Sequence, residues 1–385
     1  MLKINETRFL NFFESLKEFN ATPNNGYTRR AFSEEDLNTI QWLEETLKEY
    51  DLYSHTDSVK NVFGQYGDKK PYILIGSHLD TVQNGGLYDG ALGVLAGLEI
   101  LITLKEKNID LPFSVKLVAF RAEEANILGG TFGSHAFTGK IDYTERFLKD
   151  IKTTDLTEED VRNAHCTDDI KAYLELHIEQ GAILEQKNID IGIVTAIAGL
   201  RLLNVKVTGK SDHAGTTPMN MREDALKKAT QLLSKIYDFS ETLDDNSVLT
   251  VGELNVFPNQ SNVIPNEVNF FIDFRSSTNE KMDEYLKELS KIITEENQMT
   301  VDISAKPMDS NVIEGLERTA TELGYSNMRI VSGAGHDANT LSEQTPTGMI
   351  FVPSKDGISH HPDEYTSEEL LVKGANVMLN YIKSL

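Results

Sequence analysis

A long apolar segment between two short strand-like runs constrains the fold of this chain most strongly. The segment Ala91–Leu104 contains no charged residue except Glu99, and the runs Tyr72–Ile75 and Val115–Phe120 flank it. It falls short of the ~20 apolar residues that a membrane-spanning helix needs, so we expect a helix buried in the protein core. A strand, a long helix and a second strand in this order predict a crossover unit that joins two parallel strands.

Further segments extend this α/β pattern along the chain. Two more runs, Tyr173–Ile178 and Met349–Val352, have the composition of buried strands. Helices are predicted near 5–19, where apolar residues recur at helical spacing, and near 33–50, where a serine precedes an acidic first turn. We therefore expect an α/β fold with a mostly parallel sheet that is covered by helices.

A change in the pattern of apolar and polar residues near Gly199 indicates a second domain. Strands predicted at 203–208 and 267–275 alternate apolar and polar residues, which is typical of an antiparallel sheet with one buried face. Helices are predicted near 222–237 and 279–296. The chain of 385 residues is also longer than a usual domain of roughly 100–150 residues. We predict a catalytic domain in two parts, residues 1–198 and 309–385, and an inserted α+β domain, residues 199–308.

The charge balance excludes several classes of partner. The chain has 37 Lys and Arg residues against 60 Asp and Glu residues, and its formal net charge is −23. A field of this sign repels nucleic acids and anionic membrane surfaces, so we expect neither as a partner. The single cysteine, Cys166, excludes an intrachain disulfide and a cysteine-rich zinc site. Residues 1–19 carry charges throughout and contain no signal-peptide core, so we expect a cytoplasmic protein.

Histidines and carboxylates gather at or just beyond the carboxyl ends of the predicted strands. Open α/β sheets bind their ligands at this edge. Asp89 lies just ahead of the long apolar helix, where backbone N–H groups favour an anion. Taken singly, each residue has an ordinary structural explanation, such as a polar strand end or a helix cap. The prediction of a site therefore rests on the whole set, which is His78, Asp80, Asp89, Glu123, Glu124, His177 and His360.

The residue types in this set favour a centre with two metal ions. Histidine and carboxylate ligands without cysteine suit two divalent cations bridged by one carboxylate, as in two-metal hydrolases. Asp80 follows His78 by two residues on an extended segment, so its carboxylate can accept the second imidazole N–H. Glu123 and Glu124 are adjacent and cannot be equivalent ligands. One of them is expected to bind metal and the other to move a proton.

Motifs spread along the chain carry a family resemblance. They are GSHLDTVQNGGLYDGALGVLAGLEIL, FRAEEA, LELHIEQG, SDHAGTTPM, PNQSNVIP, SGAGHDA and MIFVPSKDGISHHPDE. Together they closely resemble the amidase, hydantoinase and carbamoylase branch of the dinuclear-zinc peptidase and aminoacylase family. This branch contains N-carbamoyl-L-amino acid hydrolases, allantoate amidohydrolases, ureidoglycolate hydrolases and β-ureidopropionases. The resemblance runs from about Thr22 to about Tyr365 in the family's order.

The resemblance implies a role for each residue of the set. One metal ion would be held by His78, Asp89 and His177, and a second by Asp89, Glu124 and His360, with Asp89 bridging the two. Glu123 would be the general base, and Asp80 would orient His78. The neighbouring His361 is the rival of His360, and the family's Gly-Ile-Ser-His pattern favours His360. Zinc or manganese would be the metal, and cobalt or nickel suits the same ligands.

The resemblance also implies how substrate is held. The inserted domain would act as a lid and mediate a homodimer, in which His213 of one subunit reaches the site of the other. Arg275, Asn262 and Gln180, with the Gly335-His336 segment, would hold the carboxylate and amide of the substrate. Independently of the family, the alternation in residues 268–275 places Arg275 opposite the apolar face of its strand, where it can clamp a carboxylate.

The implied reaction is hydrolysis of a ureido C–N bond with release of ammonia. The substrate would be a small molecule with a carboxylate, either an N-carbamoyl-L-amino acid or a related compound such as allantoate. Two alternatives stay open, namely an N-acyl amino acid aminoacylase or dipeptidase of the same fold, and an inactive metal-binding scaffold. The stretch Ala125–Leu128 departs from the Gly-x-Arg-Phe that is common in relatives, so the motifs leave the exact substrate open.

Overall fold

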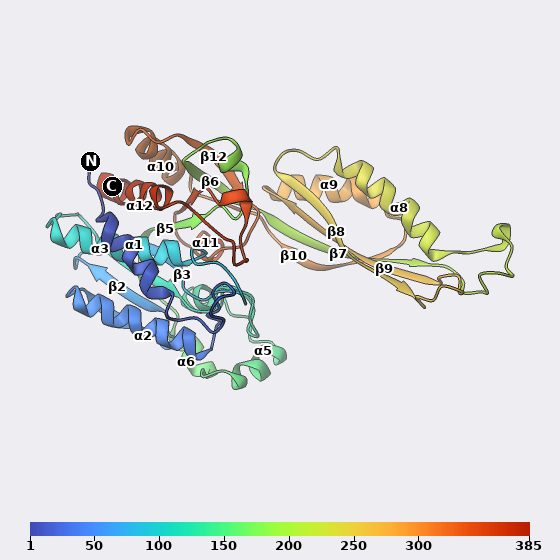
Figure 1. The fold of residues 1–385 in the computed structure, drawn as a ribbon, viewed down its shortest axis with the longest axis horizontal. Helices are drawn as coiled ribbons and strands as arrows, with labels where there is room; N and C mark the ends of the chain where they lie inside the picture. Colours follow the sequence, from blue (N-terminus) through green and yellow to red (C-terminus); the bar gives the residue numbers. More distant parts are fainter. The chain divides into compact units, whose positions relative to one another are not determined.

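The computed structural model describes residues 1–385, which divide into two compact units (Figure 1). One unit comprises Met1–Thr195 and Met308–Leu385, and the other comprises Ala196–Pro307. The second unit is thus inserted into the first, close to the boundaries of 199 and 308 that the sequence analysis placed. None of the helices combines the length and apolar composition that crossing a membrane requires.

The larger sheet is parallel at its centre and antiparallel at its flanks. Its nine strands follow the order β1-β2-β4-β3-β5-β13-β6-β11, and β12 pairs with β6. Neighbours within β4-β3-β5-β13 are parallel, whereas β2 and β6 join this centre as antiparallel strands. The predicted α/β fold with parallel strands is confirmed. The sequence analysis did not predict the antiparallel strands at the flanks of this sheet. The strands are β1 (Tyr53–Thr56), β2 (Val62–Tyr66), β3 (Tyr72–His78), β4 (Ser114–Phe120), β5 (Ile170–Ile178), β6 (Ile191–Ile197), β11 (Lys306–Pro307), β12 (Asn327–Ser332) and β13 (Thr347–Val352).

The long apolar segment forms helix α3 (Ala91–Glu106), which packs on the central strands β3, β4 and β5 (Figure 1). Every residue from Ala91 to Leu104 is buried, as a helix that is apolar on all sides requires. The carboxylate of Glu99 is completely buried, and Arg8 from helix α1 (Glu6–Leu16) pairs with it at 2.6 Å. The one charge in the apolar segment is therefore neutralised by the N-terminal helix.

The remaining helices of the first unit surround the sheet. Helix α12 packs with α1 and α3 against the strands, while α11 packs with α4 beside β5 and β13. Ser33 caps α2 through the N–H of Asp36, as the acidic first turn predicts. These helices are α2 (Glu34–Glu49), α4 (Phe132–Phe137), α5 (Glu145–Asp150), α6 (Glu158–Asn163), α7 (Ile183–Gln186), α10 (Ser310–Glu322), α11 (Asp337–Leu341) and α12 (Glu368–Ser384).

The second unit is an antiparallel sheet with two helices. The strand order is β10-β7-β9-β8, and helices α8 and α9 pack together and on the sheet. Alternate residues of β9 are buried, which confirms the predicted two-faced strand. Helix α9 ends at Ile292 rather than near 296, because Glu296 begins strand β10. The elements are β7 (Gly199–Thr208), α8 (Ala225–Ser240), β8 (Ser247–Phe257), β9 (Glu267–Ser276), α9 (Asn279–Ile292) and β10 (Glu296–Ile303).

Candidate metal centre

The carboxyl ends of the parallel strands bring histidines and carboxylates together. His78 ends β3, Glu124 follows β4, and His177 lies at the end of β5. Two groups have ligand atoms within 4.8 Å of one another: His78, Asp89 and His177, and Asp89, Glu124 and His360. Asp89 belongs to both groups, and it comes from the loop just before α3.

Asp89 lies between three imidazole rings. Its Oδ1 is 3.1 Å from Nε2 of His177 and 3.7 Å from Nε2 of His78. Its Oδ2 is 3.1 Å from Nε2 of His360, and that nitrogen is 3.3 Å from Oε1 of Glu124. One carboxylate thus has each of its oxygens directed at a different group of candidate ligands.

Backbone carbonyls orient two of the histidines. Nδ1 of His78 is 3.0 Å from the carbonyl oxygen of Asp80, and Nδ1 of His177 is 2.9 Å from that of Ile178. These contacts place the proton of a neutral ring on Nδ1 and leave the Nε2 lone pair to face Asp89. Burial lowers the pKa of His78 to about 4, so this ring is neutral at physiological pH.

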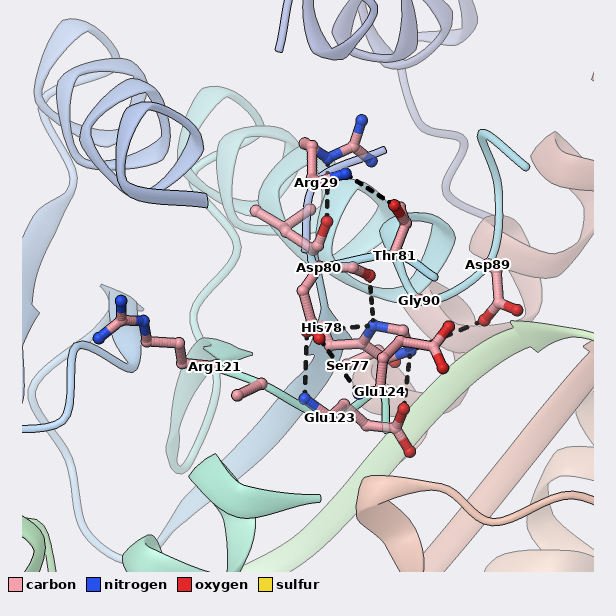
Figure 2. Close-up of polar contacts among 12 residues, drawn as sticks. Arg29, Ser77, His78, Asp80, Thr81, Asp89, Gly90, Arg121, Glu123 and Glu124 are labelled. Carbon is pink, nitrogen blue, oxygen red and sulfur yellow. Dashed lines mark hydrogen bonds and ion pairs between the residues drawn. The ribbon is translucent and has the colours of Figure 1, made fainter. Parts of the chain in front are cut away.

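The Asp80 carboxylate has a different role from the one that the sequence analysis predicted. Its Oδ1 is 3.6 Å from Nδ1 of His78, and the hydrogen bond to that ring is made by the Asp80 backbone carbonyl instead. The two carboxylate oxygens accept the backbone N–H groups of Glu123 and Glu124, both at 3.1 Å (Figure 2). Asp80 therefore ties the loop after β3 to the loop after β4.

Gly90 allows His78 to lie against the start of α3. Its φ angle is +65°, in the left-handed region that favours glycine. A Cβ atom at this position would lie 2.3 Å from Cε1 of His78. Any side chain at position 90 would thus displace the imidazole ring.

Burial and crowding of like charges raise the pKa of two carboxyl groups in the centre. Burial and nearby carboxylates raise the pKa of Glu123 well above its usual range, and raise that of Glu124 to about 8. Burial also acts to raise the pKa of Asp89, but hydrogen bonds to His177 and His360 hold it well below its usual range. Hydrogen bonding to Asp89 raises the pKa of His360 to about 9, and it outweighs burial to raise that of His177 to about 9.

These residues fit two divalent cations. The two groups offer imidazole nitrogens and carboxylate oxygens without sulfur, which suits borderline-hard metal ions. Buried carboxylates that repel one another are stabilised by a bound cation. The Nε2 atoms of His78 and His177 face Asp89, and Nε2 of His177 also accepts the backbone N–H of Gly90 at 3.2 Å.

Glu364 is a residue of the centre that the sequence analysis missed. Its Oε1 accepts the backbone N–H groups of Tyr88 and Asp89, at 2.9 Å and 3.1 Å. Its Oε2 lies 3.0 Å from the hydroxyl oxygen of Ser359, which is 3.1 Å from Oδ2 of Asp89. Glu364 thereby joins the loop that carries Asp89 to the loop that carries His360. Glu364 is the last residue of the quoted motif MIFVPSKDGISHHPDE, but the motif does not indicate its contact with the loop of Asp89.

Two further buried charges support the strand ends. Glu175 precedes His177 by two residues on β5, and it accepts hydrogen bonds from Ser77 at 2.7 Å and from the backbone of Ala338 at 2.9 Å. Arg29 is fully buried and donates from Nε to the carbonyl of Leu79 at 3.0 Å (Figure 2). Glu175 lies within the quoted motif LELHIEQG, where the sequence analysis gave it no role, and Arg29 lies outside the quoted motifs.

Three predicted substrate residues of the first unit lie at or beside the centre. Gln180 donates from Nε2 to Oδ2 of Asp89 at 2.9 Å, while its Oε1 is buried without a hydrogen-bond partner. The ring of His336 is buried and lies 4.6 Å from the ring of His177. Gly335, one residue earlier, is exposed. The rival ligand His361 is 57% exposed, lies 3.6 Å from Asp363 and belongs to neither group of candidate ligands.

The other predicted substrate residues belong to the second unit. His213 and Asn262 are exposed and adjacent, because Ala214 donates its N–H to the carbonyl of Asn262 at 3.0 Å. Arg275 forms a two-pronged contact with Asp273, at 2.8 Å from Nε and 3.0 Å from a terminal nitrogen. The structure therefore brings the motifs SDHAGTTPM and PNQSNVIP together. It places Arg275, which is paired with Asp273, on strand β9.

Comparison with known proteins identifies the family. A model of peptidase family M20/M25/M40 matches residues 52–384. The N-carbamoyl-L-amino-acid amidohydrolase of Pseudomonas sp. is 36% identical, and the match covers 98% of each chain. The allantoate amidohydrolase of Bacillus subtilis is 34% identical, with 97% of this chain and 96% of the relative covered.

A solved structure has the same fold over almost the whole chain. The amidase of the hydantoinase/carbamoylase family from Burkholderia multivorans superposes with a TM-score of 0.88 at 31% identity, covering 99% of this chain and 98% of its own. The resemblance that the motifs carried is therefore confirmed. The chain belongs to peptidase family M20/M25/M40.

Proposed function

We propose that this protein is a metal-dependent hydrolase that cleaves a ureido C–N bond of an N-carbamoyl-L-amino acid or a related compound such as allantoate. The observation that carries the proposal is the pair of ligand groups that share Asp89, with Glu123 beside them. Relatives that match nearly the whole chain are named as N-carbamoyl-L-amino-acid and allantoate amidohydrolases, which favours a ureido substrate. The complete ligand groups and the presence of Glu123 argue against an inactive scaffold.

In this proposal, His78, Asp89 and His177 hold one divalent cation, and Asp89, Glu124 and His360 hold the other. Two such cations, zinc or manganese and with cobalt or nickel as alternatives, supply Lewis acidity toward a carbonyl group and lower the pKa of water. Asp80 fixes the first group through His78 and holds the backbone of Glu124, so both groups depend on one loop.

Glu123 acts as the general base. Its Oε2 lies 3.6 Å from Nε2 of His78, and its backbone is held by Asp80. The raised pKa of its carboxyl group suits a residue that takes a proton from the attacking water and later returns it to the leaving nitrogen. The C–N bond of the ureido group breaks as the nitrogen receives this proton.

Polar side chains of both units hold the substrate. The buried and unpartnered Oε1 of Gln180 is available to accept a hydrogen bond from a ureido N–H group. Arg275 and Asn262 bind the substrate carboxylate, with Asp273 keeping the guanidinium of Arg275 in a fixed orientation. Gly335 and His336 complete the contacts to the amide.

The protein acts as a homodimer formed by the second unit, which also closes as a lid. Strand β8 is an edge of its sheet and exposes apolar side chains, with Val248 56% and Leu254 45% exposed. Such an edge is open to pairing with another chain.

His213 accepts the N–H of Gly215 on Nδ1 at 2.9 Å, so its neutral ring carries a proton on Nε2. This N–H of one subunit stabilises the oxyanion at the site of the other. The cytoplasmic location stays a prediction.

A substrate panel tests the proposed function. Protein reloaded with manganese or zinc is supplied with N-carbamoyl-L-amino acids, allantoate, ureidoglycolate, β-ureidopropionate, N-acetyl amino acids and dipeptides, and the release of ammonia or free amino acid is measured. We expect ammonia from a ureido compound and none from Glu123→Gln. Turnover of acyl amino acids or dipeptides alone would assign the aminoacylase or dipeptidase reaction instead, and no turnover with both metals bound would favour the scaffold.

A further inference from the structure

A cavity beside the metal centre has no part in the roles assigned above. Its volume is about 470 Å³, and loops that follow β3 and β4 line it with residues 81–83 and 124–127. Figure 2 shows Thr81 and Glu124, one from each of these loops. Because Glu124 also belongs to the second group of candidate ligands, a molecule held at the centre lies next to this cavity. The cavity is placed to receive a side group of the substrate.

The charge inside this cavity is set by two residues. Arg30 is the one basic residue in its lining, and Glu124 is the one acidic residue. The Glu124 carboxylate faces His360 at 3.3 Å and is neutralised when a cation is bound there. Arg30 is exposed, and its guanidinium makes no hydrogen bond, ion pair or ring contact within the protein. The metal-loaded cavity therefore presents an unpaired positive charge.

Most other polar groups of the lining are already used by the protein. The Asn126 amide donates to the carbonyls of Ala122, Glu124 and Gly129, and the hydroxyl of Thr154 donates to the carbonyl of Ile151. The hydroxyls of Thr81 and Thr153 also donate to backbone carbonyls. Arg30 and Gln83 are left as the side chains whose polar ends are available to a ligand.

Apolar residues complete the cavity. Phe32, Val82 and Ile127 line it, and Ile127 is 48% exposed. This surface can contact the methylene groups of a ligand whose end is charged. A carboxylate accepts two parallel hydrogen bonds from a guanidinium, an arrangement that an uncharged amide cannot reproduce.

We infer that this cavity is the side-chain subsite of the enzyme and that Arg30, assisted by Gln83, selects N-carbamoyl amino acids with an acidic side chain. The inference rests on the proposed function and narrows its substrate class. N-carbamoyl-L-glutamate and N-carbamoyl-L-aspartate are the substrates of this chemistry. Their isosteric amides, N-carbamoyl-L-glutamine and N-carbamoyl-L-asparagine, lack only the charge that Arg30 recognises.

The test compares kcat/KM for each acid with kcat/KM for its amide. We expect the wild-type enzyme to prefer the acid by roughly two- to fivefold, the range expected for an ion pair with an exposed arginine. Arg30→Gln should bring the ratio close to one, mainly through a higher KM for the acid, and Arg30→Lys should retain part of the preference. Arg162→Gln is the matched control, because Arg162 is an exposed arginine of the same unit that does not line the cavity. It should leave the ratio unchanged.

A binding measurement separates this inference from the proposed function. Calorimetric titration of metal-loaded Glu123→Gln with the same acid and amide measures selectivity without turnover. Absence of turnover on every ureido compound, together with selective binding of the acid that Arg30→Gln removes, would refute the proposed reaction and support the subsite. Equal kcat/KM for acid and amide in the wild type, or a preference that survives Arg30→Gln, would overturn the inference.

Discussion

Removing the side chain of Glu364 should disturb both ligand groups at once. This carboxylate accepts two backbone N–H groups of the loop that carries Asp89, and it lies 3.0 Å from the hydroxyl oxygen of Ser359 on the loop that carries His360. Glu364→Ala leaves both loops without this link. We expect lower stability and weaker metal binding, because the shared ligand Asp89 is no longer held in place.

The expected loss of stability follows from the donors left behind. A buried donor without an acceptor costs about 1–3 kcal/mol, and Glu364→Ala leaves two backbone N–H groups without their acceptor. Water that enters the vacated space can accept hydrogen bonds from these groups in part, so we expect the free energy of unfolding to fall by ~2–4 kcal/mol. Glu364→Gln keeps an oxygen for the two N–H groups and should lose less than half as much.

Urea unfolding of the metal-free protein measures the stability, and plasma mass spectrometry after dialysis measures the metal retained. Gly86→Ala provides a second route to the same change, since a Cβ there would lie 1.9 Å from Cδ of Glu364 and would displace the carboxylate. Asp363→Asn is the matched control, because Asp363 adjoins Glu364 but its side chain is 76% exposed. An unchanged metal content and a stability loss below about 0.5 kcal/mol in Glu364→Ala would refute the reasoning.

Three further predictions concern the base, the protons of the centre and the dimer. Glu123→Gln should retain both metals and lower kcat by ~10²–10⁴-fold, measured as ammonia release; a rate within tenfold of wild type would remove Glu123 as the base. Raised pKa values of about 8 for Glu124 and about 9 for His177 and His360 mean that the folded metal-free protein binds more protons than the unfolded chain above pH 6.5. Its stability should therefore fall from about pH 7 to 9 in urea unfolding, while metal affinity rises, and a flat or rising stability profile would contradict this assignment. Leu254→Lys on the edge strand should convert the proposed dimer to a monomer in analytical ultracentrifugation, and a dimer that persists in this variant would contradict an interface at this edge.

The core of the centre could be predicted because it depends on local order along the chain. His78, Glu124 and His177 come at the ends of apolar runs. Parallel strands bring their carboxyl ends to the same edge of the sheet, whatever conformation the connecting loops adopt. The two faces of β9 were predictable for a similar reason, since its buried residues alternate strictly in the sequence.

The remaining parts depend on contacts between distant segments. Glu364 meets the backbone of Asp89 across 275 positions of sequence, and nothing near either residue indicates this pairing. Strand β1 has only the short sequence Tyr53–Thr56, too polar to suggest a place in the sheet. The antiparallel addition of β6 beside β13 is also a long-range choice that residue patterns do not specify.

Metal titration of the metal-free enzyme tests the central claim most directly. Manganese is added in steps, and ammonia release from the best ureido substrate of the panel is followed together with the metal bound per chain. We predict that full activity requires two equivalents per chain and that Asp89→Asn, which alters the shared ligand, loses both metals and the activity. Full activity without metal, or two bound metals and normal turnover in Asp89→Asn, would contradict the account.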